Sequence, residues 1–326
     1  MDKKIIITGA SGMIGAGVTR YLNDKGWTNL LLVDDLKKSE KWKNLVGKQF
    51  VDIISKHALF SWLQGKEKEV DAIIHLGACS DTVEQDADYL LENNFRYTIR
   101  LAEWALKYHK RFIYASSAAT YGDGAWGFED DEAKLETLKP LNMYGFSKHL
   151  VDLWMKRQGV LDQVVGLKYF NVFGPNEYHK GRMASMLLKM MQKSSDGSVV
   201  QLFQSNDRHY PDGGQMRDFI YVKDAVKMTC AFLELKYRAV GGIFNIGQGV
   251  PTSWNVLAES FFKAIRKPTN IAYIPMPSDL AGQYQNYTCA SMGKLHKIFH
   301  NSYQAVATEE AVEEYVQQYL MRQARW

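Results

Sequence analysis

The sequence predicts an α/β fold in which a doubly wound parallel sheet carries a smaller C-terminal lobe. Two observations predict it. Up to about residue 173, short apolar runs rich in β-branched residues alternate with helical patterns, as expected when the strands of a parallel sheet are buried on both faces. Beyond residue 173 this alternation stops, and polar stretches separate the remaining elements. We therefore expect a larger domain formed by residues 1–173 and 216–249, and a lobe formed by residues 174–215 and 250–326.

The composition limits the classes of function. With 326 residues, of which 46% are hydrophobic and 23% charged, the chain can bury a large core. The net charge of +4 is spread along the chain, which gives no case for nucleic acid or an anionic membrane. No apolar run approaches membrane-spanning length, and the first residues lead directly into a strand, so we expect no signal peptide. The three cysteines show no metal-ligand spacing, which indicates free thiols in a cytoplasmic protein without a metal site.

The first predicted strand, residues 4–8, runs into a loop with three glycines at intervals of three residues, followed by a helical pattern. Gly9 allows a tight turn, Gly12 lets the backbone approach a diphosphate, and Gly15 lets the helix pack closely on the strand. The amino end of the helix then binds the anion. A lone glycine triplet often marks only a turn, but its position between a strand and a helix predicts a Rossmann-type dinucleotide-binding site.

The second predicted strand, residues 30–33, ends at two acids. Asp34 or Asp35 can bind the adenosine ribose of NAD through its free 2′-hydroxyl. A basic cluster follows at once and suits the 2′-phosphate of NADP, unless it is only a solvated loop. Residue chemistry alone therefore leaves NAD and NADP both open. The cluster consists of Lys37, Lys38 and Lys41.

A short strand is expected around residues 49–51, and another at 72–76. The small residues that follow, 77–80, leave room for a flat cofactor above the strand ends. His75 is interpreted as a histidine packed within its strand rather than as a ligand.

A long helix is predicted from about residue 87 to 108. Its apolar residues cover more than one narrow stripe, which suits burial both on the sheet and on a partner subunit, so we expect a homo-oligomer. Asn93 and Asn94 are mediocre helix formers within it, which suggests that one of them serves the site.

Three residues provide candidate catalytic groups. Ser117 ends a predicted strand at 112–117, where a hydroxyl points into the crevice that binds ligands, although a serine there can also simply cap a turn. Tyr144 and Lys148 share one face of a predicted helix. A phenol has a pKa of about 10, and a nearby ammonium favours the phenolate. Such a pair can take a proton from an alcohol while hydride leaves the same carbon, although two ordinary helix residues would show the same spacing.

The rest of the chain alternates between the two predicted parts. Polar residues 177–182 and 204–215 fall in the lobe. The elements predicted after residue 160 are strands at 164–170, 199–203 and 243–246, and helices at 183–193 and 224–235.

Taken together, these motifs resemble the extended short-chain dehydrogenase/reductase family of nucleotide-sugar epimerases and dehydratases. The resemblance covers essentially the whole chain and implies a Rossmann fold and an enzyme that uses a nicotinamide cofactor. The motifs that carry it are Gly9-x-x-Gly12-x-x-Gly15, Ser117 before a Tyr-Gly turn, Tyr144-x-x-x-Lys148, and Arg217-Asp218-Phe219 with Tyr221-Val222 and Asp224.

Further motifs resemble the branch of this family that epimerises ADP-heptose at C6, which supplies heptose for the lipopolysaccharide core. The resemblance implies an isomerase with NADP held tightly through turnover and with Tyr144 and Lys180 as two proton acceptors. It also implies that Lys148 lowers the Tyr144 pKa and holds the nicotinamide ribose, while Ser117 binds the reacting oxygen. For Lys180, a phosphate-binding or solvated surface lysine is the competing interpretation. The motifs are His75-x-Gly77-Ala78-Cys79-Ser80, the run 114–122, Tyr169-Phe170-Asn171-Val172 and His179-Lys180-Gly181-x-Met183-Ala184-Ser185.

By matching position, the resemblance also implies two sets of binding residues. The cofactor set, beside the three glycines, is Met13, Ile14, Asp34, Asp35, Lys41, Lys56, Leu76, Gly77, Ala78, Cys79, Ser80, Asn93, Lys148, Val172 and Lys180. The ADP-heptose set is Asn171, Arg182, Lys189, Phe203, Gln204, Ser205, Asn206, Arg217 and Tyr284.

Other functions remain as alternatives. A 4-epimerase of the same family would share these motifs. A 4,6-dehydratase needs an acid and a base beside the Ser117 position, whereas Ala118 and Ala119 follow here. A cofactor-binding sensor without catalysis would not need Ser117, Tyr144 and Lys148 together.

Overall fold

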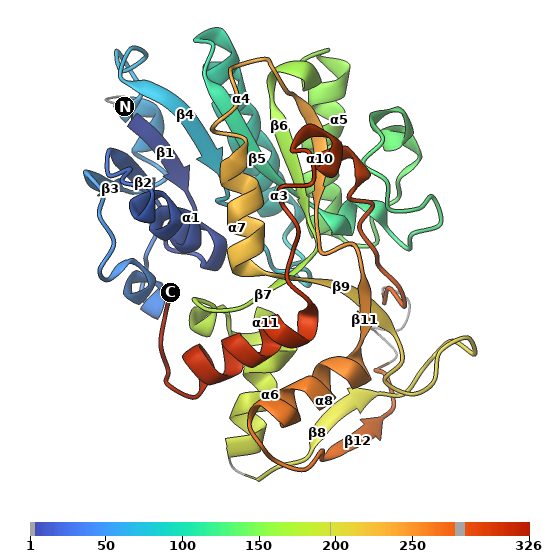
Figure 1. Cartoon of the computed structure of the whole chain (residues 1–326). Coiled ribbons are helices and arrows are strands. Elements are labelled where there is room, and N and C mark those ends of the chain that lie inside the picture. The colour runs from blue at the N-terminus through green and yellow to red at the C-terminus, as the bar shows by residue number, and fades with distance from the viewer. Residues whose placement is uncertain (1–3, 196, 278–283) are drawn as a thin grey trace.

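The computed structural model describes residues 4–195, 197–277 and 284–326. Residues 1–3, on which the expectation of no signal peptide rests in part, lie outside the described residues. Figure 1 shows a central sheet flanked by helices, with a smaller group of helices and short strands below it. Within the described residues, no helix is long and apolar enough to cross a membrane.

The centre of the larger part is a seven-stranded sheet in which every neighbouring pair of strands is parallel. The order β3-β2-β1-β4-β5-β6-β10 reverses direction between β1 and β4, which makes the sheet doubly wound and confirms the predicted fold. The strands are β1 (Lys4–Thr8), β2 (Leu30–Val33), β3 (Asp52–Ile54), β4 (Val70–His75), β5 (Arg111–Ser117), β6 (Val165–Tyr169) and β10 (Gly242–Ile246).

Helices cover both faces of this sheet. Successive residues of a strand point to opposite sides, so the apolar strands present apolar side chains on both faces. In β1, Ile5 and Ile7 pack with α1 (Met13–Asp24) and α7 (Val222–Ala231). Ile6 faces the other side, where the buried cluster includes residues of α4 (Tyr97–Lys107) and α5 (Met143–Arg157). The short helix α2 (Leu59–Trp62) adds Leu59 to the same cluster. The continuous apolar strands in the sequence are therefore explained by burial on both faces.

Several predicted elements differ from the structure in their bounds; the helix expected at 224–235, for example, is α7 and ends at Ala231. The strand expected around residues 49–51 lies slightly later, at β3, because its pairing with β2 starts at Asp52. The helix expected at 87–108 is helical throughout but not uniform, since α3 (Ala87–Leu90) is followed by a π-helical turn, η2 (Leu91–Arg96), before α4. Both asparagines lie in that turn, and π-helical turns are frequent at functional sites.

The lower part of Figure 1 contains two small sheets. The strands β7 (Asn171–Phe173), β9 (Met216–Tyr221) and β11 (Pro251–Ser253) form one sheet, and β8 (Val200–Phe203) pairs with β12 (Ile271–Ile274) in the other. The sequence predicts that the residues of β7 and β9 belong to the larger domain. In the structure these two strands pair with each other, outside the seven-stranded sheet. Helices α6 (Met186–Ser195), α8 (Trp254–Ala264) and α11 (Thr308–Glu314) complete this part.

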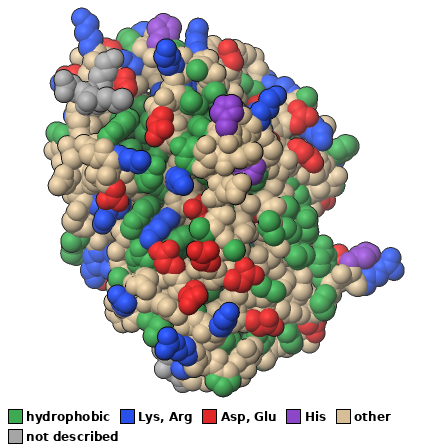
Figure 2. All heavy atoms as spheres, viewed as in Figure 1, with side chains coloured by type: hydrophobic (Ala, Val, Ile, Leu, Met, Phe, Trp, Pro, Cys, Tyr) green, Lys and Arg blue, Asp and Glu red, His purple; other side chains and the backbone are tan. Residues whose placement is uncertain are grey.

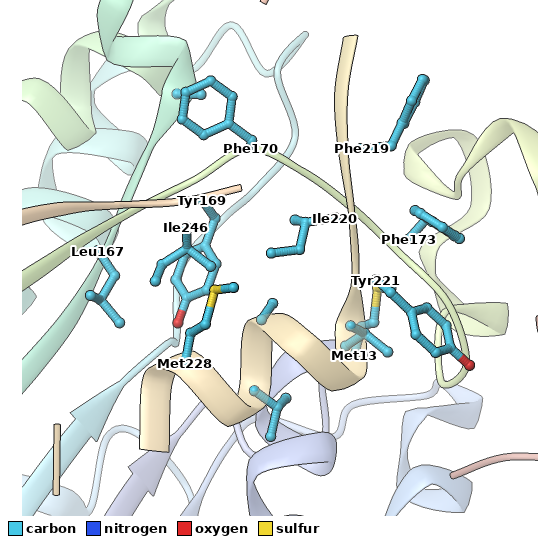
Figure 3. Close-up of a cluster of buried hydrophobic side chains, with 14 of the residues drawn as sticks. Met13, Leu167, Tyr169, Phe170, Phe173, Phe219, Ile220, Tyr221, Met228 and Ile246 are labelled. Atoms are coloured by element: carbon cyan, nitrogen blue, oxygen red, sulfur yellow. The ribbon is translucent and has the colours of Figure 1, made fainter. Parts of the chain in front are cut away.

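A continuous apolar core joins the two parts. Figure 3 shows Tyr169 of β6, Ile220 of β9 and Met228 of α7 among its members. The hydroxyl of Tyr169 lies 2.7 Å from that of Thr229, so its buried polar atom is satisfied.

The remaining helical segments are the 3₁₀ helices η1 (Glu40–Leu45), η3 (Ala118–Tyr121), η4 (Glu132–Thr137), η5 (Leu161–Gln163) and η6 (Tyr178–Met183), with α10 (Gly293–Ile298) and the π-helical η7 (Tyr315–Leu320).

Candidate active site

A cleft of about 580 Å³ opens where β1, β2, β4, β5 and β6 end. It lies at the carboxyl ends of parallel strands and includes the point between β1 and β4 where the strand order reverses, which is where sheets of this kind bind ligands. The four proposed catalytic residues, Ser117, Tyr144, Lys148 and Lys180, all line this cleft. The structure therefore brings together residues that are up to 63 positions apart (180 − 117) in the sequence.

The glycine loop approaches a neighbouring strand end so closely that side chains are excluded. Gly9 has φ +65°, and a Cβ there would lie 2.7 Å from the backbone nitrogen of Gly77. A Cβ on Gly15 would lie 2.2 Å from the carbonyl oxygen of Gly9. Gly12 precedes α1 and provides no side-chain cap, so the first amides of the helix are left for a ligand. This backbone geometry fits the diphosphate of a dinucleotide.

The acids that follow β2 are held by specific partners. Asp34 accepts hydrogen bonds from the backbone nitrogen and hydroxyl of Ser11, at 2.9 and 2.5 Å, and pairs with Lys41 at 2.6 Å. Asp35 accepts a hydrogen bond from Ser55 at 2.8 Å, and this bond together with the neighbouring Lys56 holds the pKa of its carboxyl below the usual value despite partial burial.

Two asparagines of the π-helical turn have different roles. Asn93 lines the cleft and accepts a hydrogen bond from Lys56 Nζ at 2.7 Å. Asn94 is fully buried, and its amide bonds both the backbone nitrogen and oxygen of Cys79, at 2.8 and 2.9 Å. It also donates to the Ser147 hydroxyl at 3.1 Å, so it fixes the loop after β4 against α5.

Tyr144 lies in the first turn of α5, whose amino end is capped by the side chain of Asn142. Burial raises the pKa of the Tyr144 phenol, and its hydrogen bond with Ser117 partly offsets that effect. The expectation that Lys148 lowers this pKa is wrong for the protein alone. Lys148 Nζ instead donates to the carbonyl oxygen of Ala115 at 2.8 Å, and burial lowers the pKa of Lys148 to about 8.

A buried polar network around Asp152, which the sequence does not reveal, lies next to Lys148 in the core. Asp152 lies one helical turn after Lys148 and is fully buried, and its negative charge favours the ammonium form of Lys148. Its carboxylate accepts hydrogen bonds from Tyr114 and Ser116 at 3.0 and 2.7 Å, and it lies 3.0 Å from Lys168 Nζ. The network holds β5, α5 and β6 in fixed relative positions.

Lys180 lies in η6 and reaches back over the glycine loop. Its Nζ is 3.9 Å from Met13 Sδ at the start of α1. Its backbone nitrogen donates to the carbonyl oxygen of Glu177 at 2.9 Å. Glu177 is buried, and its carboxylate accepts hydrogen bonds from the Ser185 backbone and hydroxyl and from the Tyr315 hydroxyl. The segment that carries Lys180 is therefore anchored in the smaller part of the molecule.

The predicted cofactor residues cluster as a set, with one exception. Cys79 is not among the described residues that line the cleft. The predicted cofactor residues that line the cleft are Gly9, Gly12, Met13, Ile14, Gly15, Asp34, Asp35, Lys41, Lys56, Leu76, Gly77, Ala78, Ser80, Asn93, Lys148, Val172 and Lys180.

His75 is buried between the hydroxyls of Thr8 and Thr98, at 2.6 and 2.8 Å, and burial lowers its pKa to about 3, which confirms a packed strand histidine.

The residues predicted to bind substrate are more dispersed. Lys189, Phe203 and Tyr284 line a second pocket of about 240 Å³ between α6, β8 and α8. The guanidinium of Arg217 lies 4.7 Å from the centre of the Tyr284 ring, just beside that pocket.

The other predicted substrate residues line neither pocket among the described residues. Arg182 forms an ion pair with Asp81, with its Nη2 2.5 Å from the carboxylate. Asn171 is exposed at the start of β7. Residues 204–206 begin the loop between β8 and β9, which projects from the body in Figure 1, drawn in yellow, and in Figure 2.

Sequence reasoning missed part of the cleft wall. Strand ends offered a signal for several of these residues, because the carboxyl ends of parallel strands meet at one edge. Tyr89 and Tyr97 come from helices and carry no such signal. The additional lining residues are Thr8, Val33, Leu36, Ser39, Tyr89, Tyr97, Ala115, Ser116, Tyr169, Phe170 and His179, and Lys37 of the predicted basic cluster also lines the cleft.

Comparison with known proteins gives one family. The sequence matches the NAD dependent epimerase/dehydratase family over residues 5–247. It is 47% identical over 317 residues to an ADP-L-glycero-D-manno-heptose-6-epimerase of Nitratidesulfovibrio vulgaris, covering 97% of each chain.

Two solved structures share the fold. That of the Helicobacter pylori ADP-L-glycero-D-manno-heptose-6-epimerase has a TM-score of 0.79 and 24% identity, covering 97% of this chain and 96% of that one. That of a UDP-N-acetylglucosamine 4-epimerase from Methanobrevibacter ruminantium, in complex with UDP-N-acetylmuramic acid, has a TM-score of 0.80 and 24% identity and covers 99% of both chains. The fold alone therefore does not distinguish epimerisation at C6 from epimerisation at C4.

Proposed function

The chain belongs to the NAD dependent epimerase/dehydratase family, and from that premise we propose that it is an ADP-heptose 6-epimerase. It would interconvert ADP-D-glycero-D-manno-heptose and ADP-L-glycero-D-manno-heptose and supply heptose for lipopolysaccharide core. The observation that carries the proposal is the meeting of Ser117, Tyr144, Lys148 and Lys180 in one cleft with the glycine loop. The 47% identity to a named 6-epimerase supports the choice of substrate.

The residues of the cleft can perform the acid–base part of this reaction. The cofactor, when bound, supplies the acceptance of hydride from C6 and its return to the same carbon. Tyr144 takes the proton of the C6 hydroxyl, and Ser117 holds the oxygen through the hydroxyl that already bonds Tyr144. A positioned base of this kind contributes about a hundredfold to ten-thousandfold in rate.

A second base is needed because the oxygen occupies different places when opposite faces of C6 react. C6 lies outside the sugar ring, where a rotation about one bond exchanges its faces. Lys180 approaches the cleft from η6, whereas Tyr144 approaches from α5, so the two can serve the two positions. Proton transfer requires hydrogen-bond reach, which a single fixed base would not maintain for both.

We propose NADP as the cofactor. Lys37 and Lys41 line the cleft beside Asp34, where the adenosine ribose of a bound dinucleotide would lie. The carboxylate of Asp34 is already engaged by Ser11 and Lys41, so the local environment favours a 2′-phosphate over a hydroxyl that needs a free acid.

The second pocket suits the ADP part of the substrate. Phe203 and Tyr284 offer aromatic surface for a nucleobase. Lys189 and the neighbouring Arg217 offer positive charge for a diphosphate.

The test is a comparison of substrates with the purified protein. Both ADP-heptose epimers and a panel of UDP- and GDP-sugars are incubated separately, and the products are separated by chromatography. We expect interconversion of the two heptose epimers alone. Conversion of a UDP-hexose at C4, with no action on ADP-heptose, would replace this function with that of a 4-epimerase. Tight cofactor binding without turnover of any sugar would instead favour a sensor.

A further inference from the structure

Asn44 is a buried residue that connects both sides of the cleft although it does not line it. It lies in η1 and is only 1% exposed. Its Nδ2 donates to the carbonyl oxygen of Ser11 in the glycine loop and to that of Asn176 just before η6, both at 2.9 Å. Its Oδ1 accepts from Arg325 Nε at 3.1 Å, so the whole carboxamide is used.

The two carbonyls that Asn44 binds belong to functionally different segments. Ser11 holds Asp34, the acid at the adenosine end of the cleft, through its backbone nitrogen and its hydroxyl. Asn176 directly precedes Glu177, whose carbonyl oxygen accepts from the backbone nitrogen of Lys180. One amide group therefore links the cofactor loop to the segment that places Lys180.

The Lys180 segment needs such a link because its own backbone is irregular. Asn176 has φ +76°, and Gly181 has φ +51° with no atom near the position of a Cβ. Residues on both sides of Lys180 thus adopt left-handed conformations, which regular helical hydrogen bonds do not maintain. Asn176 is held further by Trp326, whose backbone nitrogen and oxygen bond the Asn176 side chain at 2.9 and 3.0 Å.

His179 supports the same arrangement from the neighbouring position. Its Nδ1 lies 3.3 Å from Asn44 Nδ2. Burial and the charges of Lys180 and Lys41 lower the pKa of His179 to about 4, so the ring is neutral near pH 7 and its Nδ1 can accept. The imidazole thus adds a weak contact on the donor side of the Asn44 amide.

We propose that Asn44 is a positioning residue for Lys180, holding the second proton-transferring group over the cofactor loop through its hydrogen bonds to Ser11 and Asn176. This role rests on the two-base chemistry proposed above. It predicts that loss of the amide impairs the half-reaction that uses Lys180 and spares the half-reaction that uses Tyr144.

The test measures the oxidation of each epimer separately. Cofactor-loaded Asn44→Ala is mixed rapidly with ADP-D-glycero-D-manno-heptose or with its L-glycero epimer, and the absorbance of reduced nicotinamide is followed. A displacement of about 1 Å can cost about a hundredfold in rate. We expect one epimer to be oxidised about tenfold to a hundredfold more slowly, the same epimer that Lys180→Met fails to oxidise, while the other keeps its rate within about twofold.

Two further variants separate positioning from general damage. Asn44→Asp keeps the shape but replaces the donor by an oxygen that faces two carbonyl oxygens, so it should act like Asn44→Ala and gives a second chance if the alanine variant misfolds. Arg325→Met removes the contact to Oδ1 and leaves both donated hydrogen bonds, so the ratio of the two rates should stay as in the wild type. Cofactor retained after gel filtration serves as the check of folding.

Each result decides the role. If both epimers are slowed by the same factor in Asn44→Ala and Asn44→Asp, or neither is slowed, while Lys180→Met remains selective, the assignment to Asn44 is wrong and the two-base function stands. If Lys180→Met itself shows no selectivity between the epimers, the two-base function fails and the role of Asn44 fails with it.

Discussion

The Asp152–Lys168 pair allows a prediction with a magnitude, because both side chains are buried, at 0% and 1% exposure. Asp152→Asn leaves Lys168 without a counter-charge in the core. It also replaces two acceptor oxygens, which now serve Tyr114 and Ser116 separately, by a single one. Breaking one partner of a buried pair typically costs about 3–5 kcal/mol. We therefore expect the free energy of unfolding to fall by about that amount.

The measurement is chemical denaturation at equal cofactor saturation, since bound ligand adds to stability. The double variant Asp152→Asn with Lys168→Met removes both charges and keeps one acceptor oxygen, so it should recover most of the loss, because that loss comes mainly from the buried ammonium left without its counter-charge. The exposed pair Lys66–Glu69 is the matched control, and Glu69→Gln should change the free energy by less than about 0.5 kcal/mol. A loss below about 1 kcal/mol in Asp152→Asn, or a double variant less stable than the single one, would refute the reasoning.

The remaining predictions concern the cleft. Tyr144→Phe should keep its cofactor and lose about a hundredfold to ten-thousandfold in turnover, and near-normal turnover in the epimer assay would remove Tyr144 as a base. Lys41→Glu should weaken NADP more than NAD in a binding titration, because only NADP carries the 2′-phosphate, and equal weakening would exclude Lys41 from that contact. Burial lowers the pKa of Lys148 to about 8, so its ammonium predominates below that pH and is lost above it. Cofactor affinity of the wild type should therefore fall as pH rises through about 8, while Lys148→Met should show no such step.

Much of the fold could be predicted because it depends on local signals. The β-branched strands, the glycine loop and the helical patterns are each visible within a few residues. Their alternation predicts a parallel sheet, and the glycine loop after the first strand assigns it to the Rossmann type. The position of β3 was missed because a three-residue edge strand has little pattern of its own, and its limits depend on pairing with β2. Likewise, β7 and β9 fall within the residue ranges assigned to the larger domain, but only the tertiary structure shows that they pair with each other outside the main sheet.

The candidate site was predictable where a motif carries its chemistry. The glycines, Ser117, Tyr144 and Lys148 belong to such motifs, and they line one cleft. Residues that act through buried contacts give no comparable signal. Asn44 and Asp152 are recognised only from the residues that their side chains contact. Asn44 bonds Asn176, which lies 132 residues away in the sequence, and Asp152 bonds Ser116, which lies 36 residues away. The pKa of Tyr144 was predicted in the wrong direction because helical spacing does not reveal that Lys148 bonds Ala115 or that the phenol is desolvated.

The most direct test of the central claim follows the hydrogen on C6. Purified protein, without added cofactor, is incubated in ordinary water with ADP-D-glycero-D-manno-heptose that carries deuterium at C6. If hydride leaves C6 and returns to its other face within one active site, the L-glycero product forms and mass spectrometry finds the deuterium retained at C6. Absence of the product, or a product whose C6 hydrogen comes from the water, would contradict it.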